Sequence, residues 1–388
     1  MKMTDRWQDV MQNNYGTPGV ALVRGEGVHV WDEEGKRYLD FLGGIATNVL
    51  GHAHPVVVKA VSQQIAKLGH TSNLYAHEQG IELARKLQVM TGDPKAKVFF
   101  CNSGAEANEA AIKISRLTGR TQIIAAEGGF HGRTMGALSI TGQEPKRLPF
   151  KPLLTDVKFV KFGSIDALRK AISRKTAMVI LEAIQGENGV VVPPNGYLRQ
   201  VQALCDEFGV LLAIDAVQTG IGRTGEWFGF EHAGIHPNII TLAKGLGGGL
   251  PLGAMITMGS KTPNFKPGEH GSTFGGNPVS CAASNAVLDF IQKKDLLSKT
   301  RDAGDFLKGE LVQIPGVQGV RGRGLLLGIE LKGDTASTVQ AKALSKGLLV
   351  NAPNKSIIRI APSLTVKKRD LKEFVQLFAE TMSEVYRG

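Results

Sequence analysis

The sequence predicts an α/β protein in which a large domain built on a mainly parallel sheet is followed by a smaller α+β domain. Two observations support this prediction. Between residues 97 and 258, apolar runs of strand length alternate with helical patterns, as in parallel sheets covered by helices. After about residue 290, a long helical pattern is followed by closely spaced strand-like runs, which favours a second unit of different architecture. The length of 388 residues fits two or three domains.

The expected elements of the large domain follow from its apolar runs. Each strand is a short apolar run between polar segments, and each helix repeats apolar residues every three or four positions. Ligands bind beyond the carboxyl ends of parallel strands, so the residues that follow the strands are the functional candidates. We expect strands at 97–101, 122–126, 157–160, 177–181, 210–214, 239–243 and 252–258, and helices at about 104–117 and 197–207.

The C-terminal part shows the same two kinds of pattern in a different order, with no internal repeat and no low-complexity linker. Helical and strand-like segments are mixed there without the regular alternation of the large domain, which is typical of an α+β unit. We expect helices at about 296–312, 336–344 and 367–386, and strands at 317–320, 325–331 and 357–360.

Composition excludes several classes of protein. Hydrophobic residues make up 42% and charged residues 21%, as in globular proteins, and no apolar run approaches the roughly 18 residues of a membrane span. The net charge is +11, but the charges are scattered and no basic stripe carries interleaved aromatic residues. We therefore expect no membrane partner and no nucleic-acid partner. The first residues lack a secretory pattern and the three cysteines lie far apart, which predicts a cytoplasmic protein.

The segment CNSGAEANEAA at residues 101–111 is a candidate phosphate-binding turn. A predicted strand ends here, and a predicted helix begins after Ser103. Ser103 and Glu106 have the spacing of a capping box, and Gly104 lets the backbone approach a ligand closely. The start of the helix offers free N–H groups to an anion. An ordinary capped helix remains the alternative at this point.

Asp215 and Lys244 stand at the ends of two predicted strands. The carboxylate of Asp215 could hold a metal, a ribose or a protonated ring nitrogen, or it could cap the next turn. Lys244 opens a glycine-rich turn, where a partly desolvated lysine has a lowered pKa and can form a Schiff base, whereas a surface lysine is the alternative. A phosphate-binding turn, a carboxylate and a lysine are together the set that pyridoxal phosphate (PLP) requires. His52 and His54 have no further ligand at a metal-binding spacing, so we expect no metal.

Six motifs make the chain similar to the class-III PLP aminotransferases of fold type I. They are CNSGAEANEA, GFHGRT, IQGE, DxVQTGxGRTG, AKGLGGGLPLGA and HGSTFGGNP, and they occur in this order. The similarity extends from Tyr15 to Pro362 and is greatest to family members that act on acetylornithine in arginine biosynthesis. It implies that residues 1–45 join the small domain, that 46–289 form the large PLP-binding domain and that 290–388 form the small domain.

The resemblance implies roles for the residues around PLP. Lys244 bonds to the coenzyme and moves a proton between substrate and coenzyme, while Asp215 binds the ring nitrogen. Val217 and Phe130 pack on the two faces of the ring, and Gln218 binds the ring hydroxyl. The remaining coenzyme residues are Ser103, Gly104 and Ala105 at the helix start, Ala216 beside the acid, and Thr273, which in the family reaches the phosphate of the neighbouring subunit of a homodimer.

The resemblance also implies how two different substrates, N-acetylornithine and 2-oxoglutarate, share one site. Arg133 resembles the arginine for the carboxylate far from the reacting amine, and Arg359 the arginine for the α-carboxylate of 2-oxoglutarate. Glu187 resembles the family's gate, pairing with Arg359 while N-acetylornithine reacts and releasing it for 2-oxoglutarate. Ser272 would contact substrate from the neighbouring subunit, and Tyr15 would line the pocket.

Some positions bear on specificity. Ile45 stands where ornithine aminotransferases carry tyrosine, which favours the acetylornithine or 4-aminobutyrate type. Ala216 and Ala183 depart from the Glu and Pro that the family usually has at these positions, so rate and specificity can differ. The alternatives are another terminal-amine donor (succinylornithine, 4-aminobutyrate, ornithine or N-succinyl-diaminopimelate), an aminomutase, or a coenzyme-binding protein without catalysis.

Overall fold

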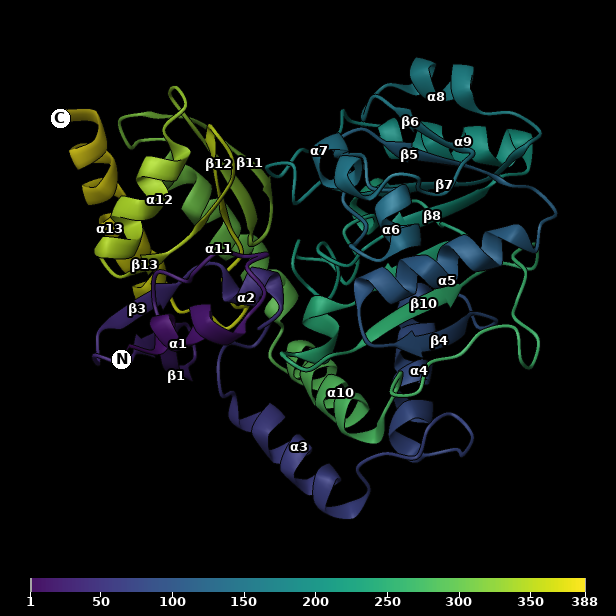
Figure 1. Cartoon of the computed structure of the whole chain (residues 1–388), viewed down its shortest axis with the longest axis horizontal. Helices are drawn as coiled ribbons and strands as arrows, with labels where there is room; N and C mark the ends of the chain where they lie inside the picture. The colour runs from purple at the N-terminus through teal and green to yellow at the C-terminus, as the bar shows by residue number, and fades with distance from the viewer. Residues whose placement is uncertain (1, 388) are drawn as a thin grey trace.

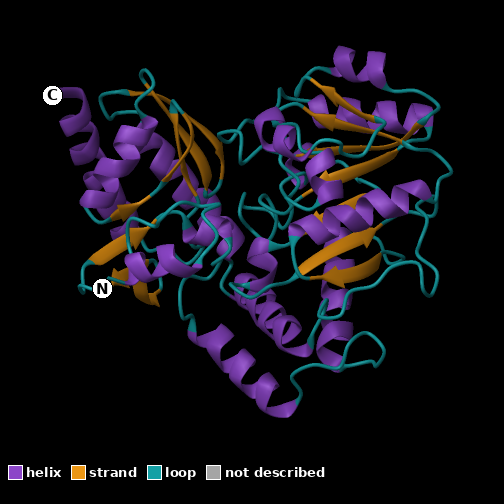
Figure 2. Ribbon diagram, viewed as in Figure 1, coloured by secondary structure: helices purple, strands orange, loops and turns teal. Residues whose placement is uncertain are grey.

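The computed structural model describes residues 2–387, and its central feature is a seven-stranded sheet (Figures 1 and 2). The strand order is β4-β10-β9-β8-β7-β5-β6. Strands β6, β5, β7, β8 and β9 are parallel neighbours, and β10 runs antiparallel to both β9 and β4. The strands are β4 (Lys97–Cys101), β5 (Gln122–Ala126), β6 (Val157–Val160), β7 (Thr176–Glu182), β8 (Leu211–Asp215), β9 (Ile239–Leu242) and β10 (Gly253–Thr257).

Helices cover this sheet and bury its apolar strands on both faces, as its continuous apolar runs require (Figure 2). α5 turns Ala107, Ala110, Ala111 and Ile114 inward, all of them buried. α10 packs on α3 and α4 at the lower end of the view in Figure 1. The helices of this part are α3 (Pro55–Lys67), α4 (Glu78–Thr91), α5 (Gly104–Arg116), α6 (Met135–Ser139), α7 (Glu144–Arg147), α8 (Ile165–Ala171), α9 (Tyr197–Phe208) and α10 (Pro278–Lys293), with 3-10 turns η1 (Leu148–Phe150), η2 (Glu231–Ala233) and η3 (Lys244–Gly247).

Two four-stranded sheets form the other part of the molecule, on the left of Figure 1, where both ends of the chain lie. One has the order β11-β12-β15-β14, and the other has the order β1-β2-β3-β13. The second sheet joins distant parts of the sequence, because β13 pairs in parallel with β3. Their strands are β1 (Leu22–Glu26), β2 (His29–Asp32), β3 (Arg37–Asp40), β11 (Val317–Arg323), β12 (Leu326–Leu331), β13 (Leu348–Leu349), β14 (Asn351–Asn354) and β15 (Ile357–Ile360); the helices are α1 (Met3–Val10), α2 (Gly43–Ala46), α11 (Leu296–Leu311), α12 (Ala336–Ser345) and α13 (Lys368–Arg387).

The predicted α/β class is confirmed, and every strand and helix expected from residue 97 onward is present. β8 ends at Asp215 rather than at the preceding residue, so the acid is part of the strand. The sequence analysis does not predict the strands of the N-terminal sheet, β13 or β14: β1 and β14 contain no buried residue, and β13 has only two residues. The domain boundaries after residues 45 and 289 stay predictions. None of the helices in the described part of the chain is long and apolar enough to cross a membrane.

Candidate active site

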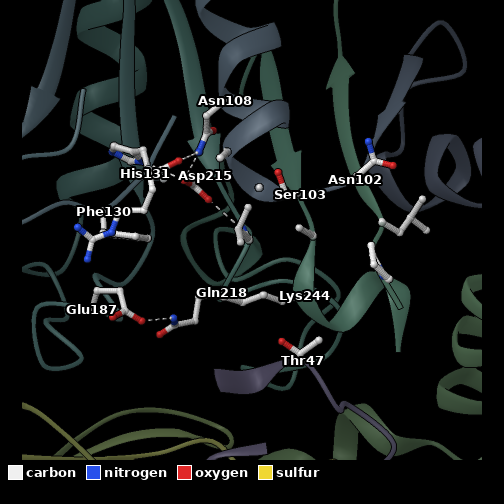
Figure 3. Close-up of a pocket in the computed structure, with 18 of the residues that line it drawn as sticks. Thr47, Asn102, Ser103, Asn108, Phe130, His131, Glu187, Asp215, Gln218 and Lys244 are labelled. Atoms are coloured by element: carbon white, nitrogen blue, oxygen red, sulfur yellow. Dashed lines mark hydrogen bonds and ion pairs between the residues drawn. The ribbon is translucent and has the colours of Figure 1, made fainter. Parts of the chain in front are cut away.

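A cavity of about 450 Å³ opens at the carboxyl ends of the parallel strands (Figure 3). It brings together ten of the residues that the sequence singled out, from segments more than 100 residues apart. Those ten are Ser103, Gly104, Ala105, Phe130, Arg133, Glu187, Asp215, Val217, Gln218 and Lys244. Thr47, Asn102, Asn108, His131, Gly132, Glu182, Ala243 and residues 249–252 complete the wall.

Asp215 ends β8 and is held by a buried hydrogen-bond network. Its Oδ2 accepts from Asn108 Nδ2 and contacts His131 Nδ1, both at 2.8 Å, and its Oδ1 accepts from the Val217 N–H at 3.0 Å. Thr241 Oγ1 donates to Asn108 Oδ1, which orients the Asn108 amide. Burial opposes the charged form of His131, but the hydrogen bond to Asp215 and its charge outweigh burial and raise the pKa of His131. The network therefore holds a carboxylate ready to face a positive group in the cavity.

Lys244 follows the end of β9 by two residues, after Ala243, and lines the cavity with a strained backbone. Its φ is +46°, a left-handed conformation that costs free energy in a residue with a Cβ. Burial lowers the pKa of the Lys244 ammonium, and the nearby Arg359 charge lowers it further against the opposing effect of Glu187, Asp215 and Glu182. An amine with a lowered pKa is more often neutral, and a neutral amine can act as a nucleophile or a base.

The start of α5 forms one end of the cavity. Ser103 Oγ accepts from the Glu106 N–H at 3.2 Å, and Glu106 Oε2 accepts from the Asn102 N–H at 2.7 Å. The expected cap therefore forms at Ser103, but the Glu106 carboxylate binds the N–H of the residue before the N-cap instead of that of Ser103 itself. The first N–H groups of the helix have no acceptor within it. A Cβ on Gly104 would lie 2.8 Å from a Val217 methyl, so glycine is what lets the start of α5 pack this closely against Val217. The end is suited to a phosphate.

Phe130 lies above Glu187 in the view of Figure 3, and Arg133 lines the same cavity. The Phe130 N–H donates to Glu182 Oε2 at 3.1 Å, and Arg133 Cζ lies 5.6 Å from the centre of the Phe130 ring. Lys146 Nζ approaches the same ring at 5.2 Å. Burial, reinforced by the charge of Asp215, raises the pKa of Glu182 to about 7 against the opposing effect of His131. Two positive side chains, Arg133 and Lys146, thus lie around the Phe130 ring.

Glu187 and Arg359 form an ion pair beside the cavity. The Arg359 side chain is 3% exposed and also donates to Gln218 Oε1 at 3.2 Å and to Asn351 Oδ1 at 2.8 Å. Gln218 Nε2 in turn donates to Glu187 Oε1 at 3.1 Å. Burial raises the pKa of Glu187, but the charge and hydrogen bond of Arg359 outweigh it and lower the pKa overall. The anionic form of Glu187 is therefore the one that the pair holds.

Five predicted site residues lie outside the wall of this cavity, and one of them is Arg359, which lies beside it. Ala216 is buried behind it, with its N–H bonded to Thr241 O. Tyr15 is 87% exposed. Ser272 is half-buried, with its Oγ accepting from Asn102 Nδ2 at 3.1 Å, and Thr273 is exposed beside it.

The sequence reasoning missed Glu182, Asn108 and Thr47. Glu182 ends β7 directly beside Asp215 of β8, so the rule that identified Asp215, an acid at the end of an apolar strand, could also have found it. Asn108 lies inside the CNSGAEANEA motif, one turn into α5, and its hydrogen-bond partners are far away in sequence. Thr47 follows a turn whose conformation has no recognisable local pattern.

Among the described residues, one other cluster has the composition of a metal site. His29, Asp370 and Glu373 place ligand atoms within 4.8 Å of one another. Both carboxylates already have partners, because Arg37 pairs with Glu373 and the Lys367 N–H donates to Asp370 Oδ2 at 3.0 Å. The cluster is explained by these ion-pair and helix-start contacts.

Comparisons with known proteins agree with the cavity. A family model described as Aminotransferase class-III matches residues 10–382. The acetylornithine aminotransferase of Streptomyces coelicolor is 55% identical over 368 residues, which is 94% of this chain and 91% of that protein. The acetylornithine aminotransferase of Elizabethkingia anophelis has a TM-score of 0.86 at 33% identity, covering 99% of this chain and 100% of that one. An ornithine aminotransferase of Toxoplasma gondii, with PLP at partial occupancy in its active site, has a TM-score of 0.92 at 30% identity, covering 99% and 94%.

Proposed function

Because the chain belongs to the class-III aminotransferases, we propose that it transfers the terminal amino group of N-acetylornithine to 2-oxoglutarate. The products are N-acetylglutamate 5-semialdehyde and glutamate, as in arginine biosynthesis. One observation carries the proposal: Arg133 lies in the cavity wall without an ion-pair partner among residues 2–387, and a second arginine, Arg359, is paired with an acid. Relatives at about half identity named acetylornithine aminotransferase support this choice of donor.

The coenzyme of this family is PLP, and the residues of the cavity fit it. The free N–H groups at the start of α5, where Ser103, Gly104 and Ala105 line the cavity, suit the phosphate. Asp215 is an anion held by Asn108 and His131, which suits a protonated ring nitrogen. Lys244, with its lowered pKa, suits a covalent bond to an aldehyde.

When bound, PLP supplies an aldehyde that takes up the amino group and a ring that accepts the electrons of the broken C–H bond. Asp215 would keep the proton on the ring nitrogen, because its negative charge favours the protonated form. Val217 and Phe130 would pack against the ring and exclude water from it, and Gln218 would bind its hydroxyl oxygen. Lys244 Nζ moves a proton to and from the reacting substrate carbon, a task for which an amine of lowered pKa is suited.

Arg133 and Arg359 would divide the two substrates between them. Arg133 would hold the carboxylate that lies far from the reacting amine or carbonyl. Arg359 would stay paired with Glu187 while N-acetylornithine reacts, so that no unpaired charge is left in the cavity. For 2-oxoglutarate, Glu187 would release Arg359, whose planar guanidinium then binds the α-carboxylate through two hydrogen bonds.

The visible absorption of the purified protein tests the proposal. We expect the band of the bound coenzyme to bleach on addition of N-acetylornithine alone and to return with 2-oxoglutarate. A band that bleaches only with ornithine, 4-aminobutyrate or a succinylated donor would reassign the donor. Bleaching that needs no 2-oxoglutarate to reverse would favour an aminomutase. Arg133→Ala should raise the KM for N-acetylornithine roughly tenfold or more, since a hydrogen-bonded charge pair is lost.

We also propose that the active form is a homodimer in which Ser272 and Thr273 serve the site of the partner subunit. Both lie outside this chain's own cavity wall, next to the exposed Phe274. The Phe274 ring packs beside His70, with ring centres 4.9 Å apart. Leu74 and Tyr75, which follow His70 closely in the sequence, are also exposed. Light scattering in solution tests the dimer, and a monomer of 41.5 kDa with full activity would contradict it.

The cytoplasm is the location that we propose for this protein. All three cysteines are free and buried, which suits a reducing compartment. Fractionation of cells that produce the protein, with an antibody against it, tests the location.

A further inference from the structure

The segment between β3 and α3 contains a turn of unusual backbone conformation. Gly43, Gly44, Ile45 and Ala46 have φ values of +59°, +63°, +62° and +63°, so four successive residues are left-handed. Glycine adopts this region freely, but Ile45 and Ala46 carry a Cβ and lose free energy there. Such a run persists only where surrounding contacts impose it. The turn leads directly into Thr47 in the cavity wall.

Asp40, at the end of β3, supplies those contacts. Its Oδ1 accepts from the N–H groups of Leu42 and Gly43 at 2.9 and 2.8 Å, and the residue is buried. Its Oδ2 contacts His52 Nε2 at 2.8 Å, which leaves neither carboxylate oxygen without a partner. Removing one partner would leave a buried carboxylate oxygen of Asp40 unpaired, which destabilises the fold. The contact with His52 therefore stabilises the buried Asp40.

His52 is itself fixed by the N-terminal hairpin. The N–H and C=O of His52 both bond to Gly27, at 2.8 and 2.9 Å. A Cβ on Gly25 would lie 2.6 Å from the Cβ of His52, so the β1 backbone presses against this histidine. These contacts fix the backbone and Cβ of His52, and its ring is oriented by the 2.8 Å contact of Nε2 with Asp40 Oδ2.

The same turn contacts the end of β15, the strand that carries Arg359. The Ala361 N–H donates to Phe41 O at 2.7 Å. The carbonyl oxygen of Ala361 lies 2.7 Å from the position that a Cβ on Gly43 would occupy. Arg359 is two residues before Ala361 on an extended strand, so a movement of the turn passes to Arg359 through a short, rigid segment. These contacts connect His52 to Arg359 in four steps, through Asp40, Gly43 and Ala361.

We propose that Asp40 and His52 are positioning residues for Arg359, and that they set the affinity of the enzyme for its dicarboxylate acceptor. The inference rests on the proposed role of Arg359 in binding 2-oxoglutarate. A bidentate contact to a carboxylate requires the guanidinium to be placed within a fraction of an ångström, so a small shift of β15 weakens it. The amine donor reacts while Arg359 is paired with Glu187, so its affinity depends much less on this placement.

The experiment compares His52→Ala with His52→Gln in the coenzyme-loaded enzyme. Loss of the imidazole should raise the KM for 2-oxoglutarate roughly tenfold and leave the KM for N-acetylornithine within about twofold. Glutamine can donate one hydrogen bond to Asp40, so His52→Gln should return the acceptor KM to within about threefold of wild type. The dissociation constant of glutarate, an unreactive dicarboxylate, should follow the acceptor KM and gives a readout independent of turnover.

His54→Ala is the matched control. His54 belongs to the same His-Ala-His sequence and packs against Phe290 at a ring distance of 4.6 Å, with no bond to Asp40. It should lower the melting temperature without changing either KM. Folding of each variant is checked by circular dichroism, and if His52→Ala does not fold, His52→Gln and Asp40→Asn carry the comparison.

The outcomes separate this inference from the proposed function. Equal increases of both KM values, or no change in a folded His52→Ala protein, would overturn the positioning role. If the wild-type enzyme does not use 2-oxoglutarate, or if Arg359→Ala leaves the acceptor KM unchanged, then the proposed function is wrong at that point, whatever His52 does.

Discussion

Replacing Glu187 with glutamine tests whether its ion pair with Arg359 decides which amine donor the enzyme prefers. The Arg359 side chain is 3% exposed, so the substitution leaves an almost fully buried guanidinium without its anion. Two opposite unit charges about 4 Å apart attract each other by about 4 kcal/mol at an effective dielectric constant of about 20. Glu187 is 22% exposed, and Gln218 and Asn351 still accept from Arg359, so we expect about 2 kcal/mol to be lost.

The loss should appear as a change in donor preference. The terminal ammonium of N-acetylornithine would approach an uncompensated Arg359, whereas glutamate would bring its α-carboxylate to the same place. About 2 kcal/mol corresponds to roughly 30-fold in kcat/KM. The ratio of kcat/KM for glutamate to that for N-acetylornithine should therefore rise roughly 30-fold in Glu187→Gln.

Single-turnover half-reactions measure this ratio directly. Each donor is mixed with coenzyme-loaded enzyme in the absence of a keto acid, and the coenzyme absorbance is followed in time. Glu226→Gln is the matched control, because Glu226 pairs with Arg301 at the surface, away from the cavity. A folded Glu187→Gln enzyme whose donor ratio stays within twofold of wild type would refute the reasoning.

The other predictions concern the coenzyme and stability. Lys244→Ala should lower turnover roughly 10⁴-fold or more in a protein that still folds, measured by steady-state kinetics and circular dichroism; near-normal turnover would remove Lys244 from the mechanism. Gly104→Ala places a methyl group 2.8 Å from Val217 and should weaken PLP binding at least tenfold in a fluorescence titration, whereas Gly309→Ala, with open space around its Cβ position, should not. Folded Glu182 keeps its proton up to about pH 7, while the unfolded chain loses it near 4.5, so this residue lowers stability as pH rises through that window. As pH rises from 4.5 to 7, the free energy of unfolding of Glu182→Gln, measured with urea, should therefore gain about 2–3 kcal/mol relative to wild type. The same pH dependence of this free energy in both proteins would contradict the raised pKa.

The sequence predicts the central sheet well because its strands are continuous apolar runs, buried on both faces. It predicts Asp215 and Lys244 for the same reason, since each directly follows such a run. The N-terminal sheet is different: β1 is exposed along most of its length, and β13 has only two residues. Strands of this kind are stabilised by pairing with distant segments, here β3 with β13, which a local pattern does not contain.

The site shows the same limit. Arg359 and Glu187 lie 172 residues apart, and only the resemblance to a family connects them in advance. The hydrogen bonds of Asn108 to Asp215 and of Asp40 to His52 depend on how the chain folds back on itself. In the sequence, Asn108 and Asp40 do not differ in type or spacing from ordinary polar residues. Residue types at strand ends are thus predictable from sequence, whereas the partners that fix their protonation and orientation are not.

The left-handed backbone of Lys244 means that the residue we propose for the chemistry also destabilises the fold. A lysine with φ of +46° costs about 1–3 kcal/mol, and the desolvation of its amine adds to this. Glycine or asparagine would relieve that cost at the same position. Selection for thermal resistance alone, with no demand for turnover, would therefore discard this lysine early. An inactive relative with asparagine or glycine here would be the sturdier protein, and its higher melting temperature would measure the free energy that the active enzyme forgoes.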